Sequence, residues 1–224
     1  MSKDRKSALP VVKPADIAIA FGFTLPRTRK EFAQEVRRLD CFSRPVPSPY
    51  ICQSIQGGVQ GEGEDDILER SFRNYQNAVL SRFLRLEELA EKRGATLVSV
   101  TFAEFGQLLE RKFSAVILFS HHEPSFGIEF LDGIFSQSML IKKIPQVPPH
   151  VRLLDLSVCN ADLLTRDLSA EPRDMLFAAI KGQKRDTSFW MEFYYYFLKL
   201  IEEQELTYTE ALRMLYEHYY KLSG

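Results

Sequence analysis

The chain has 224 residues, of which 45% are hydrophobic, and this is enough to bury a substantial core within one domain. Lysine and arginine number 29 against 30 for aspartate and glutamate, so the formal charge is -1. No overall field therefore favours nucleic acid or an anionic membrane, and the sequence has no local basic patch that would replace it. We expect a single α/β domain over residues 1–224, with neither nucleic acid nor membrane as a partner.

The cysteines and the N-terminal residues indicate the cellular compartment of the protein. Cys41, Cys52 and Cys159 are odd in number and lack the short paired spacing of a zinc site, so they predict no disulfide framework and favour a reducing compartment. The opening residues, MSKDRKSALPVVKP, carry charge with no long apolar stretch behind them, unlike a signal peptide or a transmembrane helix. We expect a cytoplasmic protein without cofactor or metal.

The first part of the chain alternates apolar runs with helical patterns. ADIAIAFGF (15–23) predicts a buried strand, and TRKEFAQEVRRLD (28–40) predicts a helix. Residues 44–66 are rich in Pro, Gly and charge, which predicts a long flexible loop. Over residues 67–93 apolar residues recur every three or four positions and predict the longest helix, which Gly94 ends as a C-terminal cap.

The middle of the chain has the pattern of a parallel sheet. ATLVSV (95–100) predicts a strand, FAEFGQLLERK (102–112) a helix, and SAVILFS (114–120) a second strand. Strands that are apolar on both faces and joined by a helix are typical of a parallel sheet covered by helices. Within residues 127–145 the dipeptide DG lies between two extended runs and predicts a hairpin.

The last third continues the alternation. We expect strands over 151–158 and 174–182, an aromatic helix over 188–204, and a closing helix over 207–222 that Thr207 and Glu210 begin as a capping box. The aromatic side chains of the 188–204 helix surround it rather than marking one face. We expect most of them to be core and the remainder to line a groove or a partner surface.

Reactive side chains follow two of the predicted strands. SAVILFS leads into His121 and His122, and VRLLDLSV leads into Cys159. Sites in open parallel sheets form where strands finish at their carboxyl ends, so neighbouring strands would bring a histidine and a cysteine face to face. An imidazole beside a thiol supports the thiolate and can protonate a leaving amine, which suits nucleophilic catalysis.

Simpler interpretations of the same residues exist. A cysteine at the end of an apolar strand is most often a small buried hydrophobe, and a histidine near a strand end is usually structural. HHE (121–123) could suggest a metal, but adjacent residues rarely direct side chains to one ion, and no third ligand has the expected spacing.

The strand ending FSH, followed by a strand ending LSVCN, resembles the caspase-like clan CD of cysteine peptidases, and in particular its CHAT branch. In that family one strand ends in His, usually followed by Gly, and the next ends in Cys. An aromatic helix before a final helix carrying EAL is similar to the CHAT ending, so the resemblance covers roughly residues 67–220. It implies a caspase-like three-layer sandwich with a mostly parallel central sheet flanked by helices.

The resemblance implies roles for individual residues. His121 matches the catalytic histidine, with His122 as the alternative, and Cys159 matches the nucleophile of a hydrolase that forms an acyl-enzyme. The backbone N–H groups of Cys159 and His122 would hold the oxyanion. His122 departs from the family's Gly; the donor survives, but a side chain restricts the backbone angles.

Relatives in this clan choose acidic or basic side chains before the scissile bond through opposite charges in the pocket. Asp155 and Asp186 are acidic candidates for substrate binding that would favour Arg or Lys, whereas Arg166 or Lys184 would favour an acidic side chain. We expect the basic preference, because the chain resembles the CHAT and separase branch more than the true caspases.

Three hypotheses therefore remain for the function. The first is an endopeptidase acting on a specific protein or peptide substrate, in a bacterial defence or cell-death system. The second is a catalytically silent caspase-like module that binds a regulatory protein partner, and the third is an unrelated small-molecule binder whose thiol is packing. We also expect the 44–66 loop to cover or order the site.

Overall fold

A computed structural model describes residues 11–43, 50–55, 63–146, 150–168, 174–181, 187–216 and 220–223. Its centre is a sheet whose described strands run in the order β2-β1-β3-β7-β8-β9. The strands of this sheet are β1 (Ile17–Phe21), β2 (Thr96–Ser99), β3 (Ala115–Ser120), β7 (Leu153–Val158), β8 (Leu176–Ile180) and β9 (Tyr220–Ser223). All neighbouring pairs are parallel except β8 with β9. The prediction of a mostly parallel α/β sheet is therefore confirmed.

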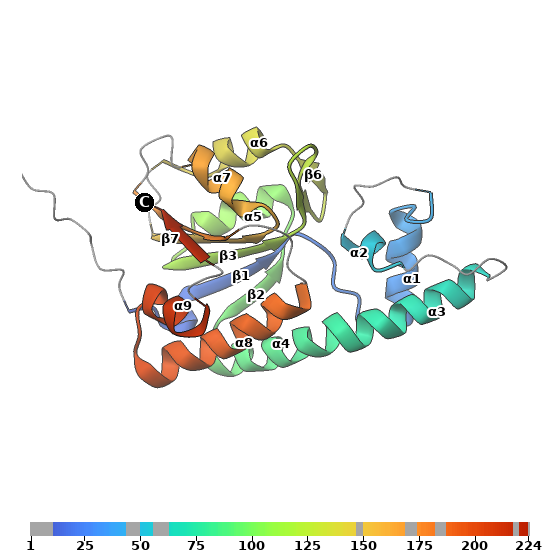
Figure 1. The fold of residues 1–224 in the computed structure, drawn as a ribbon, viewed down its shortest axis with the longest axis horizontal. Helices are drawn as coiled ribbons and strands as arrows, with labels where there is room; N and C mark the ends of the chain where they lie inside the picture. The colour runs from blue at the N-terminus through green and yellow to red at the C-terminus, as the bar shows by residue number, and fades with distance from the viewer. Residues whose placement is uncertain are drawn as a thin grey trace, which may run out of the picture.

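Helices cover both faces of this sheet (Figure 1). One face carries α4 (Ser81–Arg93), α8 (Thr187–Gln204) and α9 (Tyr208–Tyr216), and the other carries α5 (Phe102–Leu109), α6 (Gln137–Lys143) and α7 (Ala161–Leu168). The alternation of β1 divides its side chains between two cores, because Ile17, Ile19 and Phe21 pack on the first face and Ala18 and Ala20 on the second. Burial of both faces explains why the central strands are apolar throughout.

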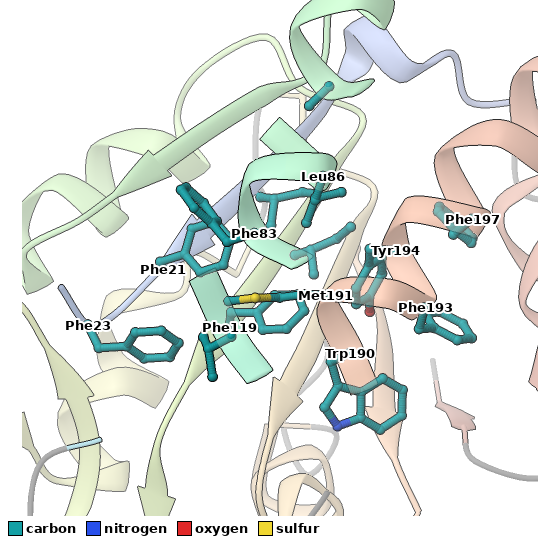
Figure 2. Packing of buried hydrophobic residues seen from close by; sticks show 14 of the residues in the cluster. Phe21, Phe23, Phe83, Leu86, Phe119, Trp190, Met191, Phe193, Tyr194 and Phe197 are labelled. Carbon is teal, nitrogen blue, oxygen red and sulfur yellow. The ribbon is translucent and has the colours of Figure 1, made fainter. Parts of the chain in front are cut away.

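The core on the α4 and α8 face is strongly aromatic (Figure 2). Phe119 of β3 lies between Phe21 and Tyr194, with ring centroids 5.4 and 5.2 Å away. Trp190 and Phe193 of α8 continue the cluster at 5.5 Å from each other. The expectation that most of the 188–204 aromatics are core is confirmed, while Tyr196 is exposed.

The predicted longest helix runs without a break from Glu64 to Arg93. It comprises α3 (Glu64–Tyr75), a π-helical segment (Gln76–Leu80, η2) and α4. Gly94 ends it in the left-handed conformation with φ 78°, as predicted. A π-helical turn inside an α-helix is rare and often lies at a functional site.

A small antiparallel sheet follows β3 directly. It consists of β4 (His122–Glu123), β5 (Gly127–Phe130) and β6 (Gly133–Phe135). The Asp132-Gly133 hairpin between β5 and β6 confirms the prediction from DG, and Gly133 has φ 144°. A side chain at Gly127, with φ 119°, would collide with the Phe135 carbonyl.

Two predicted segments differ from the structure. Within 44–66, Tyr50–Gln53 form the short helix α2 and residues 64–66 already belong to α3; residues 44–49 and 56–62 lie outside the described residues. The closing helix ends at Tyr216, and Tyr220–Ser223 form β9 against β8. Pairing β9 with β8 satisfies a sheet edge, and tyrosine favours strands. The remaining described helices are α1 (Arg29–Arg38) and η1 (Pro14–Asp16).

The expectation about the cysteines is wrong for two of the three. Cys41, just after α1, and Cys52, on α2, form a disulfide, whereas Cys159 remains a thiol outside any disulfide. The odd count concealed this pair, because sequence spacing does not reveal which cysteines meet in space. The disulfide removes the basis on which a reducing compartment was expected. Among the described helices, none combines the length and the apolar character needed to cross a bilayer.

Candidate active site

His121 and Cys159 leave the central sheet side by side. β3 and β7 are parallel neighbours, and Ser120 pairs with Val158 in their register. His121 and Cys159 are the next residues of the two strands, and neighbouring strands lie about 4.8 Å apart. Both residues line one pocket with a cavity volume of about 440 Å³. The predicted pairing of a histidine and a cysteine at this sheet edge is therefore found in the structure.

The Cys159 backbone is held in a tight turn before α7. Asn160 follows it in the left-handed conformation, with φ 54°, which asparagine tolerates better than most residues. The Cys159 carbonyl accepts a hydrogen bond from His122 Nδ1 at 2.6 Å. The thiol is therefore presented from a fixed turn and is partly exposed.

The side chain of His122 is fully buried and does not line the pocket. Burial lowers the pKa of His122, although the bond to the Cys159 carbonyl and the charge of Glu123 oppose this shift. A carbonyl only accepts hydrogen bonds, so the neutral ring carries its proton on Nδ1, and Nε2 has no partner among the described residues. Of the two candidate histidines, His121 is the one in the pocket.

The backbone N–H of His122 points away from β5. The carbonyl of His121 accepts from the N–H of Glu129, on β5, at 2.9 Å. In a trans peptide the C=O and the following N–H point in opposite directions, which turns the His122 donor to the other side. His122 is also absent from the non-glycine residues with positive φ in the described chain, so its backbone position does not require glycine.

The short helix α2 covers His121. The Gln53 amide nitrogen lies 2.9 Å from His121 Nε2, and since an amide nitrogen only donates, Nε2 is the acceptor. Two contacts anchor α2 here: the Tyr50 N–H donates to the Glu129 carboxylate at 2.7 Å, and Cys52 is bonded to Cys41. Part of the segment expected to cover the site therefore does contact it.

The charged residues proposed to select the substrate do not form the pocket. Asp155 is fully buried and accepts hydrogen bonds from Tyr194 and Tyr208, so its assignment to substrate binding is wrong. Arg166 lies on the exposed side of α7 beside Asp167 and is also outside the pocket. Asp186 and Lys184 lie outside the described residues.

Most of the pocket wall consists of residues that the sequence did not single out. Tyr50 and Gln53 come from α2 and Ser54 follows it, and residues 74, 75, 78 and 79 come from α3 and the π-helical segment. A loop-like composition hid the first group, and no periodicity marks a π-turn. Trp190 is an exception, because some aromatic residues of the 188–204 helix were expected to line a groove.

Nothing in the described part of the chain resembles a metal centre, since no group of three or more His, Cys, Asp or Glu residues could hold an ion. The arrangement instead offers a thiol, an imidazole and backbone donors at one sheet edge, which is a set suited to acyl transfer. No protein-family model matches the chain, and no curated protein matches it either.

Proposed function

We propose that the protein is a cysteine endopeptidase of the caspase-like type, with Cys159 as the nucleophile and His121 as its acid–base partner. The observation that carries this proposal is the register of β3 and β7, which puts both residues at the same edge and on the same pocket. The order of the two residues along the chain and the parallel α/β architecture agree with the resemblance described above.

The reaction needs only groups of this chain and water. His121 takes the proton of the Cys159 thiol, the sulfur attacks the peptide carbonyl carbon, and the C=O π electrons move to oxygen. Collapse of the tetrahedral intermediate breaks the C–N bond, and His121 gives its proton to the leaving amine. Water then loses a proton to His121 and attacks the thioester, and the thiolate leaves as the acid product forms.

The oxyanion would be held by the backbone N–H groups of Cys159 and His122. The direction of the His122 donor, away from β5, supports this role. So does the bond from His122 Nδ1 to the Cys159 carbonyl, which ties the two backbone segments together. His122 thus acts as a positioning residue through its side chain, in a place where the backbone does not demand glycine.

The test is peptide cleavage by matched variants. Native protein is incubated with a library of quenched fluorescent peptides beside Cys159→Ala, His121→Ala and the control His150→Ala, whose histidine is exposed and outside the pocket. We expect cleavage by the native and control proteins and none above background by the other two, with all four folded by circular dichroism. Equal cleavage by native protein and Cys159→Ala would refute the proposal.

One observation favours a second candidate, a catalytically silent module that binds a protein partner. The Gln53 amide already donates to His121 Nε2, the nitrogen that would have to accept a proton during catalysis. A silent module predicts that Cys159→Ala keeps full biological activity, whereas a peptidase predicts its loss.

A further inference from the structure

We infer that the pocket beside Cys159 takes a large uncharged side chain of the substrate, with an aromatic ring as the best fit. The inference rests on the proposed peptidase function and names the substrate class of that same site. It replaces the expectation of a basic side chain, which depended on acidic residues near the strand ends.

The described lining of the pocket has no carboxylate, ammonium or guanidinium group that could select a charged side chain. None of the described residues that line it is Asp, Glu, Lys or Arg. The nearby carboxylates are already engaged: Asp155 is buried and held by two tyrosines, and Glu129 accepts from the Tyr50 N–H. A charged side chain entering this pocket would lose hydration without gaining a counter-charge.

The walls are instead aromatic and come from several elements. Phe23, after β1, and Tyr50, on α2, have ring centroids 4.3 Å apart, and Phe119 of β3 and Trp190 of α8 also line the pocket. A cavity of about 440 Å³ is large enough for an aromatic side chain. Aromatic rings gain from edge and offset contacts with other rings as well as from burial.

The Tyr75 hydroxyl does not separate tyrosine from phenylalanine as the substrate side chain. Tyr75, at the end of α3, lines the pocket and is only 2% exposed, and its hydroxyl is buried without a hydrogen-bond partner among the described residues. The pocket therefore meets the ring of Tyr75 rather than its hydroxyl, so the phenol ring and the phenyl ring of a substrate gain the same apolar and ring contacts.

The test compares four peptides that differ only at the residue before the scissile bond: Tyr, Phe, Asp or Arg. Binding to Cys159→Ala is followed by the fluorescence of Trp190, the one tryptophan of the chain, which lines the pocket. Cleavage by native protein is measured separately. We expect the Tyr and Phe peptides to bind at least tenfold more tightly than the Asp and Arg peptides.

Variants of the π-helical segment sharpen the test. Ala78 is exposed and lines the pocket, so Ala78→Arg should improve binding of the Asp peptide, whereas Asn77→Arg, one residue away and outside the lining, should leave all four affinities unchanged.

The outcomes separate the two proposals. Tightest binding of the Asp or Arg peptide, or binding of none, would overturn this inference. If native protein cleaves the Asp or Arg peptide best, the peptidase function stands and the inference fails. If Cys159→Ala binds the Tyr peptide but native protein cleaves nothing, the inference about the pocket stands and the peptidase function fails.

Discussion

The strand β7 carries polar groups in two regions that differ in what they contact. Within the sheet, Asp155 Oδ2 accepts from the hydroxyls of Tyr194 and Tyr208 at 2.6 and 2.7 Å, and Tyr220 and Ser157 lie 2.6 and 2.7 Å from the Tyr194 hydroxyl. Past the sheet edge, Cys159 faces a cavity. The same strand thus builds a closed buried network and an open site, and the boundary is the point where the parallel ladder ends.

Ser157 joins the two regions, because it lines the pocket and also contacts Tyr194. The buried network connects β7 to α8, α9 and β9, which fixes the strand beneath the nucleophile. We expect changes in the network to act mainly on stability and changes at the sheet edge to act mainly on activity. The following predictions test that division, beginning with the largest effect.

Replacing His121 with Ala should lower kcat/KM for peptide cleavage by about 10³-fold or more, because the leaving amine loses its proton donor. The midpoint of thermal unfolding should stay near the native value, since His121 contributes to the pocket and not to the core. Steady-state kinetics and calorimetry measure the two quantities. Activity within tenfold of native would remove His121 from the mechanism.

The buried network should make stability depend on pH. Burial raises the pKa of Asp155 to about 7, against the hydrogen bonds from Tyr194 and Tyr208, which lower it. The folded state then holds a proton that the unfolded state, with a pKa near 3.8, releases. The contribution of Asp155 to the free energy of unfolding is fully present below about pH 3.8. It decreases as the pH rises to about 7, by an amount on the order of 4 kcal/mol.

Asp155→Asn isolates this effect, because asparagine stays neutral and keeps an oxygen for the two tyrosines. Urea titration from pH 4 to pH 8 measures the free energy of unfolding of both proteins. As the pH rises, we expect the native protein to lose stability relative to Asp155→Asn. A difference that is constant across this range would show that Asp155 titrates normally.

Tyr208→Phe removes one donor from the network and should cost about 1 to 2 kcal/mol of unfolding free energy, with peptide cleavage nearly unchanged. Tyr196→Phe is the matched control on the exposed side of α8 and should cost less than about 0.5 kcal/mol. Urea unfolding of both variants measures these costs. Equal costs for the two would mean that the buried hydroxyl is not part of a stabilising network.

Gln53→Ala should raise kcat/KM by about fivefold, because His121 Nε2 no longer shares its lone pair with a neutral donor worth about 1 kcal/mol. Gln53→Glu serves as a comparison, since a carboxylate cannot donate in the same way. A fall in activity for Gln53→Ala would instead make Gln53 a group that orients the imidazole.

Sequence reasoning worked where side-chain pattern and backbone geometry are tightly coupled. Apolar runs identified β1, β3, β7 and β8, and the 3.6-residue period identified the long helix up to Gly94. Parallel strands place their ends at one edge, so the proximity of His121 and Cys159 followed from two strands alone. Features that depend on distant partners did not follow, as the disulfide of Cys41 and the turn of the chain into β9 illustrate.

The wrong prediction for Asp155 has the same cause, because its surroundings also depend on residues distant in the chain. Its position four residues before the nucleophile suggested a substrate pocket. The alternation of side chains along a strand predicts on which face of the sheet Asp155 lies, but not whether helices bury it there. Asp155 is buried under Tyr194 and Tyr208, whose hydroxyls donate to its carboxylate and which come from helices later in the chain. Gln53 was missed because a four-residue helix leaves little periodic signal, whereas the period of the long helix placed Tyr75 on its apolar face without showing that it lines a pocket.

Whether Cys159 cleaves protein is tested by comparing newly formed protein N-termini in cells that express the native chain or Cys159→Ala at equal levels. If Cys159 is the nucleophile of a peptidase, a defined set of new N-termini will accompany the native chain only. If the pocket beside Cys159 takes an aromatic side chain, Tyr and Phe will be enriched immediately before the cut. The same N-termini in both cell populations would contradict the claim that Cys159 cleaves protein.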